Sequence, residues 1–360
     1  MEDNDPVLSL YRIIVEIYVV GTLCVLGIAG NLLCIVVLGR DRTNHRSTGF
    51  LLQMLAVADA VYLVTCIFIQ TLNCVRKMTD WLPLVVRLHW PYVELHSWPM
   101  ASVAQMASVW LVVVLTADRY VAICHPMHAP QYSTISRLRK AVAAVWILAV
   151  VYNLPRFFER VVVVVDDEDD VSGNWTSLAA TSSPDLALVT SSAVTDDGRR
   201  VMLRKTAMSE HSVYVIVYKS CLFFIVRFFV PFAALAFFNQ RLIHAMRSSH
   251  QMRLRSAVGG SSSSKERQHT RTLVVVVLVF VICELPDLTL RFWWMVSQYA
   301  PDHVAFPMYE VGYVNIASNF LLIVNSCINF VIYCFMGRYF RLILLRMIGC
   351  GGERPVLRNR

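Results

Sequence analysis

Long apolar stretches separated by polar segments make up most of this chain. Seven of them stand out: Ile13–Leu38, Thr48–Cys74, His96–Cys124, Ala141–Phe158, Val213–Ile243, Thr272–Val296 and Tyr309–Phe335. Most exceed the ~20 residues that an α-helix needs to cross a hydrocarbon core of ~30 Å. The fourth is shorter, and we expect it to continue into the valine run after Arg160. The pattern predicts an all-α membrane protein in which seven transmembrane helices form one bundle.

Composition and loop charges agree with this prediction and orient the chain. With 56% hydrophobic and 16% charged residues, the chain lacks the balance of a soluble globular protein. With the N-terminus outside, the inner segments are 39–47, 125–140, 244–271 and 336–360, and the outer segments are 1–12, 75–95, 159–212 and 297–308. The inner segments contain 18 Lys or Arg and 3 Asp or Glu, whereas the outer segments contain 9 and 16. Because basic loops stay on the cytoplasmic side, the N-terminus is predicted to be extracellular. The net charge of +8 then requires no nucleic-acid partner.

The prediction divides the chain into an extracellular N-terminus (1–12), a membrane domain (13–335) and a cytoplasmic tail (336–360). In the tail, Gly337–Arg346 alternates basic and apolar residues at helical spacing, which predicts a short amphipathic eighth helix on the inner leaflet. Cys350 follows this helix and is either a palmitoylation site or a plain thiol.

The second outer segment, 159–212, is long and rich in Ser, Thr and Asp. It includes an unbroken acidic run from Asp166 to Asp170. Such a composition favours disorder. Asn174 opens the sequence Asn174-Trp175-Thr176, so on the outer side of the membrane it is a candidate for glycosylation.

Among the charged residues in the apolar stretches, the triplet at the end of the third stretch and Asp59 in the second are considered first. The triplet Asp118-Arg119-Tyr120 closes the third stretch, before an expected loop from Val121 to Pro126. Ionised groups at such a place mark function more often than packing, although a simple acid–base pair at a helix end is the alternative. Asp59 lies inside the second stretch and requires partners from other helices.

Further landmarks lie at characteristic places in the stretches: Gly30-Asn31, Ser108, Trp146, Pro231, Phe280, Cys283, Pro286 and the run Asn325–Tyr333. Together with the triplet, this set resembles the rhodopsin-type G-protein-coupled receptors. The resemblance implies that Asp118 holds Arg119 at rest and that Arg119 meets a heterotrimeric G protein in the active state. The residues assigned to this switch are Asp118, Arg119, Tyr120, Asn329 and Tyr333.

The same resemblance implies a cavity between the helices that holds water and a sodium ion. The matching residues are Asp59, Ser108, Asn325, Ser326 and Asn329. Oxygen ligands suit such a hard cation. The alternative is that Asp59 is protonated and bonded to asparagine amides without any ion. No other cofactor is expected.

Subfamily features narrow the resemblance. Glu284 stands in Cys283-Glu284-Leu285-Pro286 where a tryptophan is usual, and Phe330 follows Asn329 where a proline is usual. With the second inner loop, His125–Thr134, these features resemble the invertebrate FMRFamide, myosuppressin and sex-peptide receptor group. The resemblance implies an extracellular neuropeptide ligand that ends in an amidated Arg-Phe.

Candidate ligand-contacting residues lie in the outer halves of the stretches: Glu284, Asp287, Gln105, Trp98 and Trp294. A carboxylate pairs bidentately with a guanidinium, so Glu284 and Asp287 are candidates to bind the arginine of the peptide. The alternative is internal pairing of these acids with Arg291, Lys219 or Arg227. The tryptophans are candidates for an aromatic rim, or they are membrane anchors.

Other classes are disfavoured by the residues at the matching positions. Ile323 stands where a retinal-binding opsin needs its lysine, and Ala101 where an amine receptor needs an aspartate. No Ser/His/Asp or metal-binding spacing suggests an enzyme. The expected protein is a multi-pass plasma-membrane receptor whose partners are a peptide, a G protein, arrestin and membrane lipids. The alternatives are a receptor for another peptide or lipid, and a transporter.

One feature departs from the family. Its hallmark disulfide joins the outer end of the third helix to the second outer loop, but Glu94 stands at the helix position and residues 159–212 contain no cysteine. Only Cys74 lies clearly at the outer face, so no disulfide is expected. The alternatives are a divergent receptor, a receptor of low stability, and a gene with a wrongly assigned segment.

Overall fold

A computed structural model describes residues 10, 13–40, 46–78, 84–129, 133–165, 193–194, 200–255, 262–299, 308–336 and 338–347. Asn174 and Cys350, the two predicted modification sites, lie outside these residues. The seven predicted spans are all helical. Their elements are η2 (Ile13–Val20) with α2 (Gly21–Arg40); α3 (Arg46–Cys66) with η3 (Ile67–Leu72) and α4 (Asn73–Met78); α5 (Leu84–Cys124); α7 (Ile135–Asn153) with η4 (Leu154–Phe158); η7 (Tyr214–Phe229) with α10 (Val230–Arg255); α11 (Ser262–Tyr299); and α12 (Met308–Met336).

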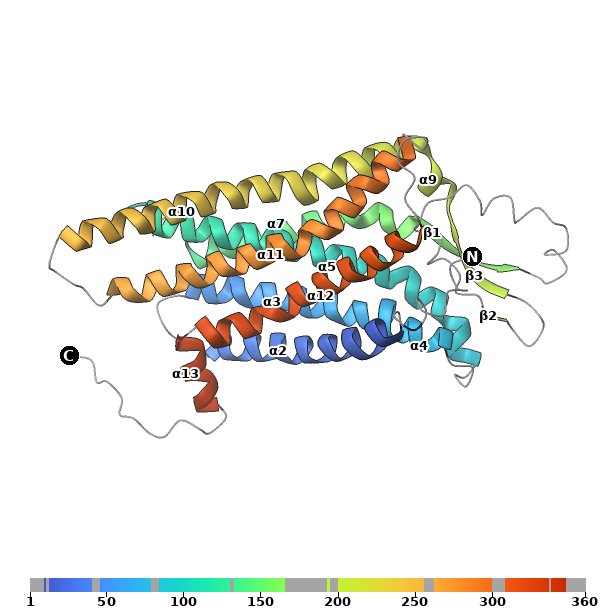
Figure 1. Cartoon of the computed structure of the whole chain (residues 1–360), viewed down its shortest axis with the longest axis horizontal. Coiled ribbons are helices and arrows are strands. Elements are labelled where there is room, and N and C mark those ends of the chain that lie inside the picture. Colours follow the sequence, from blue (N-terminus) through green and yellow to red (C-terminus); the bar gives the residue numbers. More distant parts are fainter. Residues whose placement is uncertain are drawn as a thin grey trace.

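The long helices run side by side and form one elongated bundle, with the short strands at one end and α13 (Arg338–Met347) at the other (Figure 1). A helix satisfies its own backbone polar groups, which is what hydrocarbon surroundings demand. Six of the described spans are long and apolar enough to cross a membrane. The remaining long helix, α11, contains the predicted stretch Thr272–Val296, which includes Glu284, Asp287 and Arg291. The predicted seven-helix architecture is confirmed.

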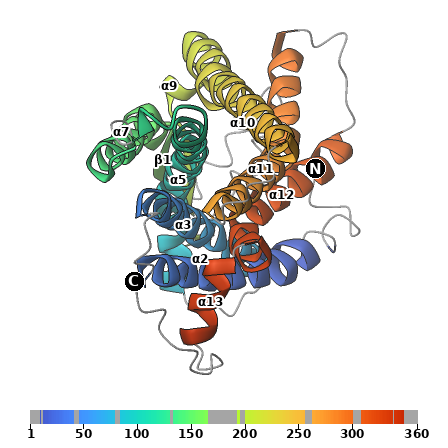
Figure 2. The same ribbon diagram turned by 90° about the vertical axis from the view of Figure 1, so that its left-hand side faces the viewer.

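Helix α5 lies at the centre of the bundle, among α3, α7 and α10 (Figure 2). In its most apolar part 67% of the residues are buried, against 22% for α7. Large apolar side chains of α7, such as Ile147 and Leu148, are 62% exposed on the outside of the bundle. That surface suits lipid, so the hydrophobic exterior is consistent with a membrane environment.

The third helix begins earlier than the predicted stretch and ends with it at Cys124, inside the expected loop. It starts at Leu84, well before His96, and it continues through Cys124. The expected loop from Val121 to Pro126 therefore begins only at His125. Apolar residues such as Val121 and Ile123 fit a helix as well as a loop, and the helix satisfies their backbone groups.

The valine run after the fourth span is not helical, contrary to the expectation that this span continues into it. Arg160–Val165 forms strand β1, which pairs antiparallel with β3 (Arg200–Lys205), from Arg160 opposite Lys205 to Val165 opposite Arg200. A short strand, β2 (Ala193–Val194), joins the other edge of β3. Valine is β-branched and favours extended backbone. The two described ends of the second outer loop are thus ordered as a hairpin, whereas 166–192 lies outside the described residues.

The predicted amphipathic helix after the seventh span is confirmed as α13. Its Phe340 is buried and contacts the rings of Phe330 and Tyr333 at centroid distances of 6.0 and 5.9 Å. Arg341, by contrast, is exposed. The buried aromatic residue fixes α13 against the inner end of α12.

Candidate functional site

At the inner end of α5, two of the predicted switch residues, Asp118 and Arg119, form an ion pair. Arg119 donates two hydrogen bonds to Oδ2 of Asp118, from Nη2 at 2.6 Å and from Nε at 3.2 Å. The other oxygen of Asp118 accepts a hydrogen bond from the hydroxyl of Ser133, which precedes α7. The Asp118 side chain is 1% exposed and that of Arg119 13%. The arginine is therefore held by its neighbour beneath the inner surface.

Tyr120 and Tyr333, also assigned to the switch, lie apart from this pair. The hydroxyl of Tyr120 is 3.0 Å from Nε2 of His125, and its ring packs on Phe238 of α10 at 5.4 Å. Tyr333 is buried, and its hydroxyl has no hydrogen-bond partner among the described residues. The contact of Tyr120 with Phe238 joins the end of α5 to α10. The contact of Tyr333 with Phe340, described above, joins the end of α12 to α13.

Asp59 sits fully buried at the meeting point of three helices. Its Oδ1 accepts a hydrogen bond from the Ser108 hydroxyl of α5 at 2.9 Å, and its Oδ2 accepts one from Nδ2 of Asn329 of α12 at 2.8 Å. The side chain of Ser326 also lies within hydrogen-bonding reach of the carboxylate. The partners that a membrane carboxylate requires thus come from the helices on which they were expected.

Some of the oxygen atoms around Asp59 are suitable ligands for a small hard cation. The carboxylate and the hydroxyls of Ser108 and Ser326 are suitable ligands. Asn329 meets Asp59 through its amide N–H, as a donor, and the contacts within the described chain do not join Asn325 to Asp59. The arrangement suits either a cation held by the three oxygen-bearing side chains or a hydrogen-bonded carboxylate without one.

A second buried cluster of charges lies in the outer half of the bundle, on α11 and η7. Asp287 accepts a hydrogen bond from Nε of Arg291 at 2.9 Å, one helical turn further on. Glu284 is 3% exposed; its strongest attraction is to the charge of Arg227 on η7, and Gln105 of α5 lies beside it. Internal pairing, which the sequence left as an alternative, is thus the arrangement that this structure contains for Asp287.

The predicted aromatic rim is only partly described. Trp98 lies in the outer half of α5, where the guanidinium of Arg160 is 5.8 Å from its ring centroid. The side chain of Trp294 lies outside the described residues. Trp98 therefore contacts the base of the second outer loop.

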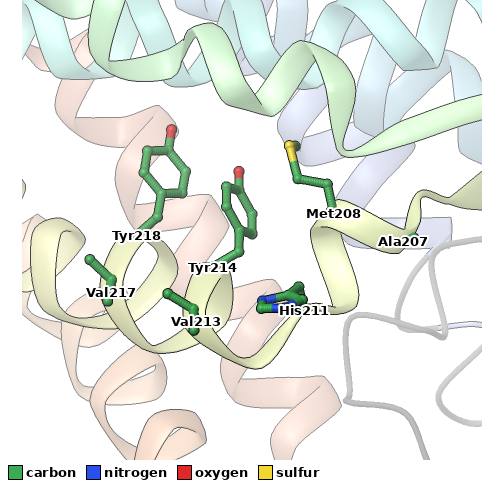
Figure 3. Close-up of a pocket in the computed structure, with 7 residues that line it drawn as sticks. All are labelled: Ala207, Met208, His211, Val213, Tyr214, Val217 and Tyr218. Atoms are coloured by element: carbon green, nitrogen blue, oxygen red, sulfur yellow. The ribbon is translucent and has the colours of Figure 1, made fainter.

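A surface hollow of about 660 Å³ opens near the outer end of the fifth span, between α9 (Ala207–Glu210) and the first turns of η7. Figure 3 shows the rings of Tyr214 and Tyr218 side by side, with Met208 facing them. Both hydroxyls are engaged: that of Tyr214 donates to Oε1 of Glu159, and that of Tyr218 to the carbonyl of Tyr152. No predicted ligand-contacting residue lines this hollow.

Two parts of these sites were missed in the sequence. In the sequence, Ser133 is only one residue of the second inner loop, His125–Thr134. In the structure its hydroxyl donates a hydrogen bond to Asp118. Arg227 was considered only as a neutralising charge, although it is 5% exposed at the centre of the outer cluster. A lone arginine in an apolar stretch was the available signal, because such residues almost always face the bundle interior.

The fold and these buried polar groups define a membrane receptor of the seven-helix class. Residues 30–333 match the family described as "7 transmembrane receptor (rhodopsin family)". The match covers most of the chain, so the chain belongs to that family.

Receptors for peptides are among its relatives. The chain is 25% identical to the FMRFamide receptor of Drosophila melanogaster over 348 residues, which cover 95% of the chain and 55% of that receptor. It is 29% identical to the Drosophila melanogaster sex peptide receptor over 255 residues, 67% of the chain and 52% of that receptor. It is 25% identical to the human motilin receptor over 358 residues, 92% of the chain and 80% of that receptor. The chain thus spans about half the length of the first two of these relatives.

Proposed function

We propose that this chain is a cell-surface receptor for an extracellular neuropeptide with an amidated Arg-Phe end, and that it activates a heterotrimeric G protein. The similarity to receptors named for FMRFamide in Drosophila melanogaster and Caenorhabditis elegans supports the ligand class. The chain does no chemistry on the peptide. The ligand binds the active arrangement more tightly than the resting one and shifts a pre-existing equilibrium by that difference.

The single observation that carries the signalling part is the buried pair of Asp118 and Arg119. The guanidinium of Arg119 lies at the inner end of α5. Its two hydrogen bonds to Asp118, together with the hydrogen bond from Ser133 to Asp118, hold this charged group beneath the surface. Loss of that hold would leave a buried charge uncompensated, which is costly, so the arginine would move to a new partner. A G protein at the inner face is the partner that we propose.

The cation proposal rests on Asp59, Ser108 and Ser326. A bound sodium ion would supply positive charge beside the buried carboxylate, and these three side chains would hold it. The carboxylate, hydroxyl donors and Asn329 amide link α3, α5 and α12 at one point. Any change in the separation of these helices would therefore change the site.

A receptor for a different peptide is the second candidate. Receptors named for motilin, somatostatin and allatostatin-A are related to the chain at 23–25% identity, close to the 25% of the FMRFamide receptor. The test is a panel of amidated and non-amidated peptides applied to cells that express the chain, with second messengers and arrestin recruitment as readouts. A response to amidated Arg-Phe peptides is expected; a response confined to another peptide would replace the proposed ligand and retain the receptor.

A further inference from the structure

The outer cluster contains two positive and two negative side chains and is therefore close to neutral. Arg227, Glu284 and Asp287 are buried, whereas Arg291 is exposed. Arg227 lies on η7, whereas Glu284, Asp287 and Arg291 lie on α11. Both guanidinium groups stack on one ring, that of Phe223, at 5.5 Å for Arg227 and 4.9 Å for Arg291. Asp287 accepts a hydrogen bond from Arg291, and Arg227 is attracted by both Glu284 and Asp287, more strongly by Glu284.

Several N–H groups at this pair have no acceptor. Nε and Nη2 of Arg227 are buried and lack a hydrogen-bond partner among the described residues, and Nε2 of Gln105, which lies beside Glu284, makes no hydrogen bond of normal geometry there. An unpaired buried donor costs ~1–3 kcal/mol, and native structures contain few. Donors from two helices, η7 and α5, thus converge beside one carboxylate, that of Glu284. A ligand oxygen placed there would accept one hydrogen bond from each of the two side chains.

We propose that Arg227, Gln105 and Glu284 form the subsite for a primary carboxamide, the amidated C-terminus of the peptide. The carboxamide oxygen accepts hydrogen bonds from Arg227 and Gln105, and its NH₂ group donates to Glu284. This assignment rests on the proposed function of the chain as a peptide receptor, and it differs from the expectation that Glu284 binds the arginine of the peptide.

Charge balance selects a neutral group over either charged one. A C-terminal carboxylate would be attracted by Arg227 but repelled by Glu284. A guanidinium would be attracted by Glu284 but repelled by Arg227. In a carboxamide the oxygen accepts hydrogen bonds and the adjacent NH₂ group donates them. This matches Arg227, a positively charged donor, next to Glu284, a negatively charged acceptor. A carboxamide also adds no charge to the neutral cluster.

The subsite residue Glu284 lies about two turns before an exposed residue of the same helix, Arg291. The Arg291 side chain is 46% exposed, whereas that of Asp287, its partner, is 7% exposed. The chain end of a peptide that enters from the outer side would pass Arg291 to reach Arg227 and Glu284. The stacked guanidinium groups are held in place on Phe223, so the subsite is organised before the ligand arrives.

Competition binding on cells that express the full chain tests this subsite, with the tetrapeptide Phe-Met-Arg-Phe as the amide and as the free acid. The amide should bind at least about tenfold more tightly, ~1.4 kcal/mol. Glu284→Gln should reduce this preference to about threefold or less, ~0.7 kcal/mol, because a glutamine side chain can donate to the carboxylate instead of repelling it. Equal binding of amide and acid to the unmodified receptor would overturn the subsite but leave the receptor assignment intact.

Arg227→Gln should weaken binding of the amide about tenfold or more. Because removal of one partner of a buried charge pair can prevent folding, the double variant Arg227→Gln/Glu284→Gln keeps the cluster neutral. It should reach the surface and bind amide and acid about equally. Retained preference for the amide in the double variant would overturn the subsite. Lys219→Gln, a charge removal on the same helix near Glu159 and outside the cluster, should leave the preference unchanged.

A peptide with citrulline in place of arginine separates this assignment from guanidinium binding by Glu284. Citrulline should weaken binding by the same factor on the unmodified receptor and on Glu284→Gln, because different groups are involved. If citrulline costs nothing further on Glu284→Gln, Glu284 binds the guanidinium and the carboxamide subsite is wrong. If no amidated Arg-Phe peptide binds the surface-expressed receptor, the proposed function fails, and the subsite fails with it.

Discussion

Asp118 holds Arg119 with a single carboxylate oxygen, which accepts two N–H groups at 2.6 and 3.2 Å, while its other oxygen accepts from Ser133. Both carboxylate oxygens are therefore engaged, one within α5 and one toward the start of α7. Charge-assisted hydrogen bonds of this kind are about twice as strong as neutral ones. The pair links the orientation of one arginine to the packing of two helices at the inner face.

The first prediction is that Arg119→Ala abolishes G-protein activation while agonist affinity changes by no more than about tenfold, ~1.4 kcal/mol. The reason is distance, because Arg119 lies at the opposite end of the bundle from the outer cluster. Second-messenger production and peptide binding at equal surface expression are the measurements. Arg139→Ala, which removes an exposed arginine of α7, is the matched control and should leave both unchanged. Normal signalling by Arg119→Ala would return the triplet to the role of a simple helix-end ion pair.

The seven spans could be predicted because the length that an apolar helix needs to cross a membrane does not depend on tertiary contacts. The ends of elements were less predictable. A run such as Val161–Val165 is apolar enough for either a helix or a strand, and only pairing with Arg200–Lys205 decides between them. Similarly, α5 begins at Leu84, so its first turns contain charged and aromatic residues. The sequence of these residues alone favours a loop.

The site around Asp59 was predicted more completely than the outer cluster. Asp59, Ser108 and Asn329 could be joined through a family resemblance, and the structure brings them within hydrogen-bond distance. The place of Arg227 depends on η7, a wide helix in which the Val230 N–H bonds to the carbonyl of Ile225, five residues back. Such a helix shifts which side chains face inward, and a 3.6-residue period does not reveal it.

The second prediction concerns Asp59→Asn, which keeps the shape of the side chain and removes its charge. If Asp59, Ser108 and Ser326 hold a sodium ion, this variant should lose any dependence of agonist affinity on sodium. Affinity should be compared in sodium chloride and in an equal concentration of N-methylglucamine chloride, so that ionic strength is constant. Sodium sensitivity that persists in Asp59→Asn would place the cation elsewhere.

The third prediction is that Gly30→Ala destabilises the bundle. A Cβ atom at Gly30 would lie 3.0 Å from Cβ and 3.1 Å from Cγ of Phe330, where α2 meets α12. Overpacking of this kind typically costs ~1–3 kcal/mol. Gly49→Ala is the matched control, because nothing lies within 4 Å of its added Cβ. There the better helix propensity of alanine should be neutral or stabilise by up to ~1 kcal/mol. Thermal unfolding of the two purified variants is the measurement; equal unfolding temperatures would show that α2 and α12 can separate freely.

The fourth prediction concerns topology. Tags at the N-terminus and near residue 185 should react with antibody on intact cells, whereas tags near 260 and 358 should react only after permeabilisation. The reason is the difference in loop charge, 18 basic and 3 acidic residues in the inner segments against 9 and 16 in the outer ones. Surface staining of a tag near residue 260 on unpermeabilised cells would reverse the proposed orientation.

The fifth prediction follows from the way in which the second outer loop is attached without a disulfide. None of the described cysteines is bonded to another. The base of the loop is instead closed by hydrogen bonds around Glu159, whose backbone carbonyl accepts from the Thr206 N–H at 2.9 Å and whose Oε1 accepts from the Tyr214 hydroxyl at 2.8 Å. Peptide binding should therefore be unaffected by dithiothreitol, at concentrations that inactivate a rhodopsin-family receptor with a disulfide to this loop.

The same attachment should be sensitive to Glu159→Ala, which removes the acceptor of Tyr214 and the charge near Lys219. A lost hydrogen bond to a charged group costs ~1.5–3 kcal/mol, so the agonist should dissociate more than about tenfold faster. Glu210→Ala, at an exposed acid of the same loop, is the control and should have little effect. Loss of binding in dithiothreitol would mean that a covalent bond outside the described residues holds the loop. An unchanged dissociation rate in Glu159→Ala would mean that the strand pairing of β1 with β3 suffices.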